Sequence, residues 1–230
     1  MSTTPGQNMG EKVADLKSRY EDFLNRANLS GVASRVSTLT TDLSRLPELI
    51  ADVRQRGYVY RAFLEQKADV LTQQWRDLQS RVHTTLNREI DDLREQLKPA
   101  DAAIRQIDFR PTLPVINNLE STLNLVQEKI EAAESRVSDL FRPLETELQT
   151  TKRQLDEIKW FLQMKDEACF SFYPTEALYM VTKAEWVASG RGKDDPDGIL
   201  FLTDQRLVFE QKETVGGGLF RRGEQKHEVE

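Results

Sequence analysis

A long heptad series limits what this chain can fold into. Within residues 116–144 apolar side chains recur at every third or fourth position, at Ile116, Leu119, Leu123, Val126, Ile130, Ala133, Val137, Leu140 and Leu144. This spacing places them on one narrow face of an α-helix, as in a coiled coil. A four-residue step continues the face through Leu148, Leu155, Ile158 and Leu162, which predicts one helix roughly 70 Å long. Pro143 is expected to bend this helix near its middle.

A second apolar face runs through the preceding hundred residues. Its first part consists of Val13, Leu16, Tyr20, Phe23 and Ala27, and residues 28–31 interrupt it. A heptad frame then continues through Val32, Val36, Leu39, Leu43, Leu46, Ile50, Val53, Tyr60, Leu64, Leu71 and Leu78. The frame passes through Pro47 and Gly57. Either the helix kinks at Pro47, or Pro47 is the first residue of a new helix.

Two prolines within four residues, Pro111 and Pro114, mark the clearest break in the helical region. A tight turn near 109–114 predicts an antiparallel helical hairpin. The helices of residues 11–46 either add a third member to this bundle or pair with a second chain. Because the apolar stripe is narrow and long, we expect dimerisation through the heptad seams.

The pattern changes after Met164, where short apolar runs alternate with loops rich in glycine and aspartate. Strands are predicted at residues 185–189, 199–202 and 206–210, with two further strands at 219–221 and 225–229. The predicted organisation is a disordered lead-in (1–10), an elongated coiled-coil domain (11–165) and a β domain (166–230). The fold class is therefore mainly α with a small C-terminal β part.

The stretch GILFLTDQRLVF, residues 198–209, carries the only family-level signal in the chain. Leu200 and Leu202 on one strand and Leu207 and Phe209 on the next are expected to form one buried face, and Thr203 and Asp204 can cap the turn. The stretch resembles the signature hairpin of GRAM and bacterial pleckstrin-homology-like (PH-like) domains, over residues 185–213. The resemblance implies a partly open barrel of about seven strands with a capping helix.

Only 65 residues follow Lys165, whereas a whole domain of that family needs roughly a hundred. We therefore expect an incomplete PH/GRAM-like antiparallel domain. Either the chain is a truncated form of a longer protein, or the β part is a reduced meander, or a partner supplies the missing strands. The last strand would then present an open edge.

The charge distribution argues against a nucleic-acid partner and disfavours a polybasic membrane anchor. The 230 residues carry 32 Lys plus Arg against 38 Asp plus Glu, and residues 1–165 hold 24 basic and 25 acidic side chains with interleaved signs. Nucleic-acid binding requires a basic face that releases counterions from phosphate, so it is not expected. The same mixture disfavours a polybasic membrane anchor.

The single cysteine, Cys169, rules out an intramolecular disulfide and lacks the Cys/His neighbours of a zinc site. No apolar h-region and no uncharged apolar run of about 18 residues is present, so neither a signal peptide nor a transmembrane helix is expected. The expected location is the cytoplasm, with attachment to a membrane surface as the alternative.

No constellation predicts a catalytic, cofactor-binding or metal-binding site, and the chain is not expected to be an enzyme. Arg191 and Lys193, in the loop where PH-like domains hold lipid headgroups, are candidates for a partner or a headgroup, as are Arg221 and Arg222. Asp194, Asp195 and Asp197 weaken the positive field at the first pair. The predicted function is a coiled-coil scaffold or adaptor that oligomerises and presents a PH/GRAM-like module to a protein partner. The alternative is a peripheral membrane protein with a lipid-binding PH-like domain.

Overall fold

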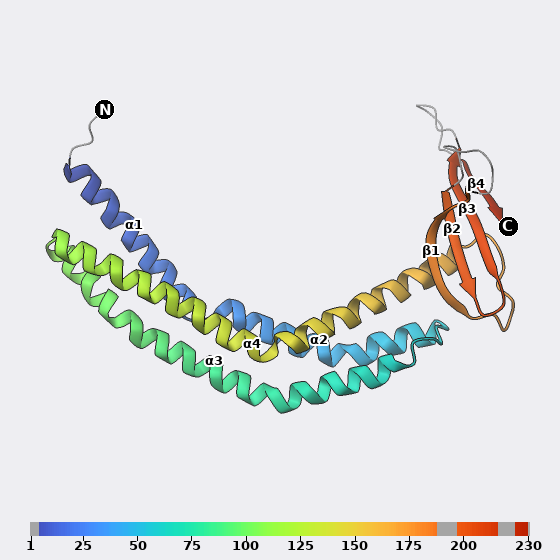
Figure 1. Ribbon diagram of the computed structural model, residues 1–230, viewed down its shortest axis with the longest axis horizontal. Coiled ribbons are helices and arrows are strands. Elements are labelled where there is room, and N and C mark those ends of the chain that lie inside the picture. Colours follow the sequence, from blue (N-terminus) through green and yellow to red (C-terminus); the bar gives the residue numbers. More distant parts are fainter. Residues whose placement is uncertain (1–4, 188–196, 216–223, 230) are drawn as a thin grey trace. The chain divides into compact units, whose positions relative to one another are not determined.

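The computed structural model describes residues 5–187, 197–215 and 224–229. Four helices precede four strands (Figure 1), which confirms a mainly helical chain with a small C-terminal antiparallel sheet. The helices are α1 (Pro5–Arg26), α2 (Ser30–Gln55), α3 (Phe63–Phe109) and α4 (Leu113–Asp166). The strands are β1 (Leu178–Glu185), β2 (Asp197–Thr203), β3 (Leu207–Val215) and β4 (Glu224–Val229).

The chain forms two compact units. Unit 1 contains Met1–Ser44 and Leu71–Glu147, and unit 2 contains Arg45–Val70 and Leu148–Glu230. This division cuts through α2, α3 and α4, whereas the sequence led us to place a boundary at residue 166. The difference arises because the sheet packs with the adjoining helix ends rather than forming a unit of its own.

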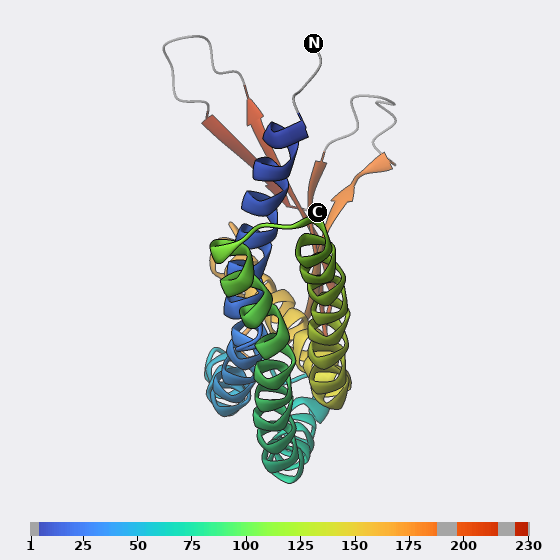
Figure 2. The same cartoon turned by 90° about the vertical axis from the view of Figure 1, so that its left-hand side faces the viewer.

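In unit 1 the chain reverses between α3 and α4 at residues 110–112, and α1 and the first half of α2 lie along the resulting hairpin (Figures 1 and 2). Ion pairs join α4 to each of the other three helices. They link Lys12 of α1 to Glu120, Arg35 of α2 to Glu145, and Glu89 of α3 to Arg136. The helices of residues 11–46 therefore join the bundle of their own chain.

The heptad seam of α4 is closed within one chain. Leu119, Leu123, Ile130 and Val137 are all fully buried. The exposed apolar stripe from which we expected a dimer is therefore absent from these positions, and a dimer through the heptad seams stays a prediction.

Prolines lie at the start of α1 and inside α2 and α4. α1 begins at Pro5, inside the predicted lead-in of residues 1–10, because a proline in the first turn sacrifices no helical hydrogen bond. Pro47 lies within α2, so the alternative of a new helix beginning there is wrong, and α4 likewise continues through Pro143. An interior proline costs about 3 kcal/mol, which the burial of neighbours such as Leu46 and Ile50 offsets.

The predicted frame through Gly57 is wrong, because the chain reverses there. Gly57 adopts a φ of 91°, and the Tyr58 amide donates to the Val53 carbonyl at 3.1 Å, which is a Schellman-type end to α2. Tyr58, at 1% exposure, is buried in place of Tyr60. α3 then begins at Phe63.

The sheet is an antiparallel meander in the order β1-β2-β3-β4. β2 and β3 contain the predicted strands 199–202 and 206–210 almost entirely, and β4 contains 225–229. The strand predicted at 185–189 is wrong, because β1 ends at Glu185. The apolar residues that form β1 precede it, and Trp186 packs on Phe209 instead, with ring centroids 5.2 Å apart. Residues 219–221 lie outside the described residues.

The buried carboxylate of Glu89 gives a test of how α3 and α4 are held in register. Its side chain is 4% exposed and accepts from Arg136 Nη2 at 2.6 Å and Arg88 Nη2 at 3.1 Å. Replacing Arg136 with methionine should lower the free energy of unfolding by about 2 kcal/mol, because a buried charge loses its main partner. In thermal and denaturant unfolding, the exposed pair of Arg105 and Asp101 provides the control. R105M should change stability by less than about 0.5 kcal/mol, and equal effects of the two variants would contradict this role.

Candidate functional site

Glu176 and Arg206 form the tightest polar cluster of the sheet module, which we define as residues 168–187 and 197–211. Arg206 donates from Nε to Glu176 Oε1 at 2.8 Å and from Nη2 to Glu176 Oε2 at 2.9 Å, a bidentate pair. The Tyr173 amide and the Thr203 hydroxyl complete the shell of this carboxylate, each at 2.8 Å. Hydrogen bonding from Arg206 is the largest cause that lowers the pKa of Glu176 to about 2.

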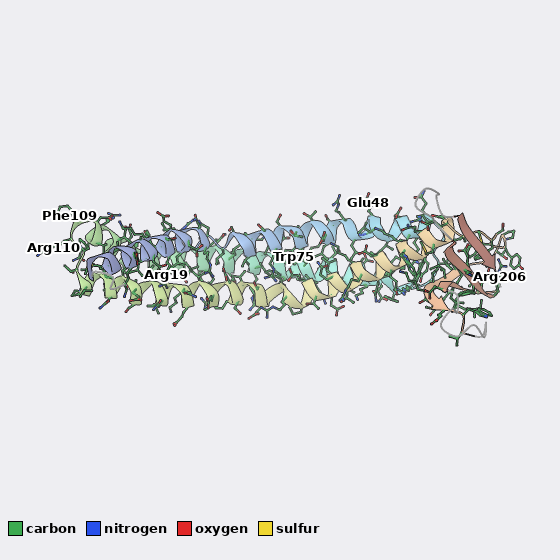
Figure 3. All side chains as sticks on the ribbon, turned by 90° about the horizontal axis from the view of Figure 1, so that it is seen from above. Arg19, Glu48, Trp75, Phe109, Arg110 and Arg206 are labelled. Carbon is green, nitrogen blue, oxygen red and sulfur yellow. The ribbon has the colours of Figure 1, made fainter. Side chains whose placement is uncertain are left out.

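The same cluster explains how the stretch LTDQRL, residues 202–207, forms a turn. Thr203 Oγ1 accepts from the amides of Gln205 and Arg206 and so closes the turn between β2 and β3. Asp204 does not cap this turn, because its Oδ1 accepts from the Ala177 amide at 2.9 Å. Arg206 also donates to the Ser171 carbonyl at 2.7 Å and lies 4.1 Å from the Tyr173 ring centroid. Figure 3 labels Arg206 on the sheet module.

One face of the sheet, which we call the inner face, is covered by the segment that follows α4. Val181, Phe201 and Val208 are paired across β1, β2 and β3 and are each at most 3% exposed. Phe170 and Phe172 pack on Phe201, with ring centroids 5.1 and 6.1 Å apart. The inner face is therefore the core of the sheet module.

The predicted buried face is the opposite one, which we call the outer face, and that prediction is wrong in part. The register does place Leu200 beside Phe209 and Leu202 beside Leu207 on one face. Phe209 is buried beneath Trp186, but Leu200 and Leu202 are half-buried and Leu207 is 58% exposed. Both faces of β2 are apolar, so alternation could not show which face the post-helical segment covers.

The loop between α2 and α3 is held by one arginine. Arg54 donates to the carbonyls of Tyr58, Tyr60 and Arg61 at 2.8, 2.6 and 3.1 Å. It also makes a bidentate pair with Glu65, at 2.7 and 2.9 Å. The hydrogen bond from Arg54 lowers the pKa of Glu65. A single side chain thus fixes residues 58–61 against the first turn of α3.

This loop contacts the start of β1. The Tyr58 hydroxyl donates to the Tyr179 carbonyl at 3.3 Å, and the rings of Tyr60 and Tyr179 meet edge to face with centroids 5.0 Å apart. Arg61 pairs with Glu157 at 2.6 Å, and Arg56 pairs with Asp166 at 2.7 Å, so the loop also contacts α4. Because the heptad frame passed through Gly57 and included Tyr60, sequence reasoning missed the loop. Gly57 followed by Tyr-Val-Tyr was the available signal of a helix end and an extended segment.

The predicted binding residues Arg191, Lys193, Arg221 and Arg222 lie outside the described residues. Within the described ranges, no group of three or more His, Cys, Asp or Glu side chains is placed to hold a metal ion. Cys169 is exposed, and its amide donates to Glu210 Oε1 at 2.6 Å. No helix in the described part of the chain is both long enough and apolar enough to span a bilayer.

In comparisons with known proteins, no family model, no curated protein and no solved structure matches this chain. The likeness of residues 198–209 to a GRAM or PH-like hairpin therefore stays a prediction. The argument about function rests on the geometry of the described residues.

The described groups with shifted pKa values are engaged in contacts that hold the fold together. The carboxylates whose pKa values are lowered, Glu65, Glu89 and Glu176, each accept a hydrogen bond from an arginine that holds two elements together. The pKa of Tyr58 is raised by burial, and its hydroxyl is engaged with β1. These perturbed groups therefore have structural partners, and the exposed apolar positions of the outer face are the more promising surface.

Acid should loosen the sheet module through Glu176. Its folded-state pKa of about 2 is below the ordinary value of 4.5, so the stabilisation is present above pH 4.5 and is lost as the pH falls toward 2. E176Q should lower the free energy of unfolding by about 2 kcal/mol at neutral pH. It should also flatten the pH dependence between pH 4.5 and 2.

Near-ultraviolet circular dichroism, followed during denaturation at several pH values, measures both effects. E48Q, at an exposed carboxylate of α2 in the same unit as the sheet, is the control and should behave like the wild type. A variant E176Q that unfolds with unchanged midpoint and pH profile would show that the cluster does not stabilise the module.

Proposed function

We propose that this protein is a non-enzymatic scaffold or adaptor that oligomerises and uses its helical units to present the C-terminal sheet module to a protein partner. The outer face of the sheet is the observation that supports this proposal. Met180, Leu202 and Leu207 form one row across β1, β2 and β3, and Leu200 and Phe209 belong to the next row. Strands with apolar residues on both faces are typical of sheets that are covered on both sides.

The composition of this surface fits protein recognition. Interfaces are enriched in aromatic residues and methionine at their centres and are depleted of charge there. Leu207 is 58% exposed within the row, while Met180 and Leu202 are half-buried and already fixed by strand pairing. A partner that covers this row would therefore bury apolar area without ordering new backbone. A PH/GRAM-like fold for the module belongs to the same proposal.

Replacing Leu207 with lysine should remove partner binding and leave the fold intact, because the side chain points away from the inner core. The protein would be used as bait for cross-linking and mass spectrometry, and the candidate partner would then be purified and titrated by calorimetry. We expect L207K to weaken binding at least about tenfold, because one central apolar contact is lost.

L125K is the matched control, because Leu125 is 49% exposed on α4 within unit 1. It should bind the partner like the wild type. Failure of any purified protein to bind the wild type, or equal losses in both variants, would contradict the proposal.

The alternative, binding to a membrane surface, is favoured by a different observation. At the turn between α3 and α4, Phe109 is 96% exposed and Leu113 is 59% exposed, with Arg110 between them (Figure 3). An exposed aromatic residue beside a basic one can partition into the interface of an anionic bilayer.

F109S should abolish any binding to vesicles, because it removes the most exposed aromatic side chain of the turn. Pelleting with phosphatidylcholine vesicles, with and without phosphatidylserine, at two salt concentrations measures this. L125S is the control and should pellet like the wild type. A wild-type protein that stays in the supernatant with anionic vesicles at low salt would rule out the membrane alternative.

A further inference from the structure

The outer edge of β1 offers a surface for a second copy of this chain. In the described sheet β1 lies at one end of the order β1-β2-β3-β4, and β2 is its one strand neighbour there. A strand in this position presents backbone N–H and C=O groups along its free edge, and these can extend a sheet by pairing with another strand.

The structure limits the part of this edge that can pair. At its beginning, the register between β1 and β2 shifts between Leu178 and Met180, and the Tyr58 hydroxyl occupies the Tyr179 carbonyl. Beyond that point Lys183 and Glu185 are exposed, and Val187 is 69% exposed. The accessible edge therefore runs over residues 181–185, because β1 ends at Glu185.

The sequence of this edge is complementary to itself. When two antiparallel copies are related by a twofold axis at Ala184, Lys183 of each copy lies opposite Glu185 of the other. Ala184 then lies opposite Ala184 of the second copy, so the pairing stays within β1. Both relations place side chains of the same face together, as antiparallel pairing requires. Two opposite-charge pairs and one pair of small apolar side chains result.

The neighbouring symmetric registers lack this complementarity. An axis at Lys183 places the two lysines opposite each other, and an axis at Glu185 does the same with the two glutamates. Like charges directly opposite each other disfavour pairing. An axis at Thr182 leaves Glu185 opposite Tyr179, whose carbonyl is already engaged by Tyr58. The axis at Ala184 is thus the register that the charges select.

We propose that two copies of this protein associate through the outer edges of β1, paired antiparallel about Ala184, with Lys183 of each copy opposite Glu185 of the other. The proposal rests on the proposed scaffold function, since it names the surface through which the scaffold oligomerises. It leaves the outer face of the sheet, including Leu207, free for a different partner.

A charge-swap series tests the register. Sedimentation velocity of the full chain over a concentration series should show a monomer–dimer equilibrium for the wild type. K183E and E185K each create two like-charge pairs and should weaken the dimer about tenfold or more. The double variant K183E/E185K restores both pairs with their signs exchanged and should recover the wild-type dissociation constant.

A cysteine pair tests the position of the axis. In a C169S background, A184C places two thiols across the axis, where Cβ atoms are about 5 Å apart. T182C places its thiols four residues out of register, roughly 13 Å apart. A thiol cross-linker shorter than that separation should join the A184C chains and leave T182C monomeric in denaturing gels.

Three results would overturn the proposal: a monomer at every concentration, a dimer whose affinity ignores the charge swaps, or equal cross-linking at positions 182 and 184. L207K should dimerise like the wild type. Loss of partner binding without loss of the dimer, or the reverse, therefore separates failure of the proposed function from failure of this inference.

Discussion

The apolar stripe of α4 is the constraint on which the helical part of the structure depends. It extends over a 54-residue helix, and Ile116, Leu119, Ile130 and Ile158 along it are fully buried. A stripe of this length in water would cost far more than the helix gains from its own hydrogen bonds, so other helices must cover it. In each unit the chain's own helices do so, and the prolines at 47, 99 and 143 are accommodated because burial around them outweighs their local cost.

Arginine-to-carboxylate pairs then fix which elements meet. Glu89 anchors α3 to Arg136 of α4, Arg54 holds the loop before α3, and Arg206 ties the β2–β3 turn to Glu176. The Glu89 and Glu176 side chains are almost or fully buried, so removal of the arginine would leave a charge without water. Such pairs add less to stability than the apolar seam, but they are directional. Apolar positions repeat every heptad, so one helix could shift by a heptad against its neighbour and still bury them. A bidentate ion pair forms in one register only.

The sheet module differs from the helical seam because part of its apolar surface remains uncovered. Its inner face is closed by Phe170 and Phe172, while Leu207 on the outer face and Val187 beyond β1 are exposed. The carboxylates with lowered pKa values have arginine partners, and we propose that the uncovered apolar surface serves recognition. The outer face and the β1 edge are separate surfaces, and a scaffold can use one for a partner and the other for a second copy of itself.

Local sequence patterns determined the helical class, the reversal near the two prolines, the β2–β3 hairpin and the placement of Leu200, Leu202, Leu207 and Phe209 on one face, because each depends on local spacing. They did not determine which face of the hairpin is buried, since Ile199, Leu200, Phe201 and Leu202 are apolar on both faces. They also missed the α2–α3 loop, because the heptad frame runs through Gly57 without interruption. Only the tertiary structure decided these points: Phe201 is buried because Phe170 and Phe172 reach it, and Tyr58 is buried because Arg54 turns the chain toward β1. Contacts between residues far apart in the chain leave no period in the sequence, so no local pattern could have shown them.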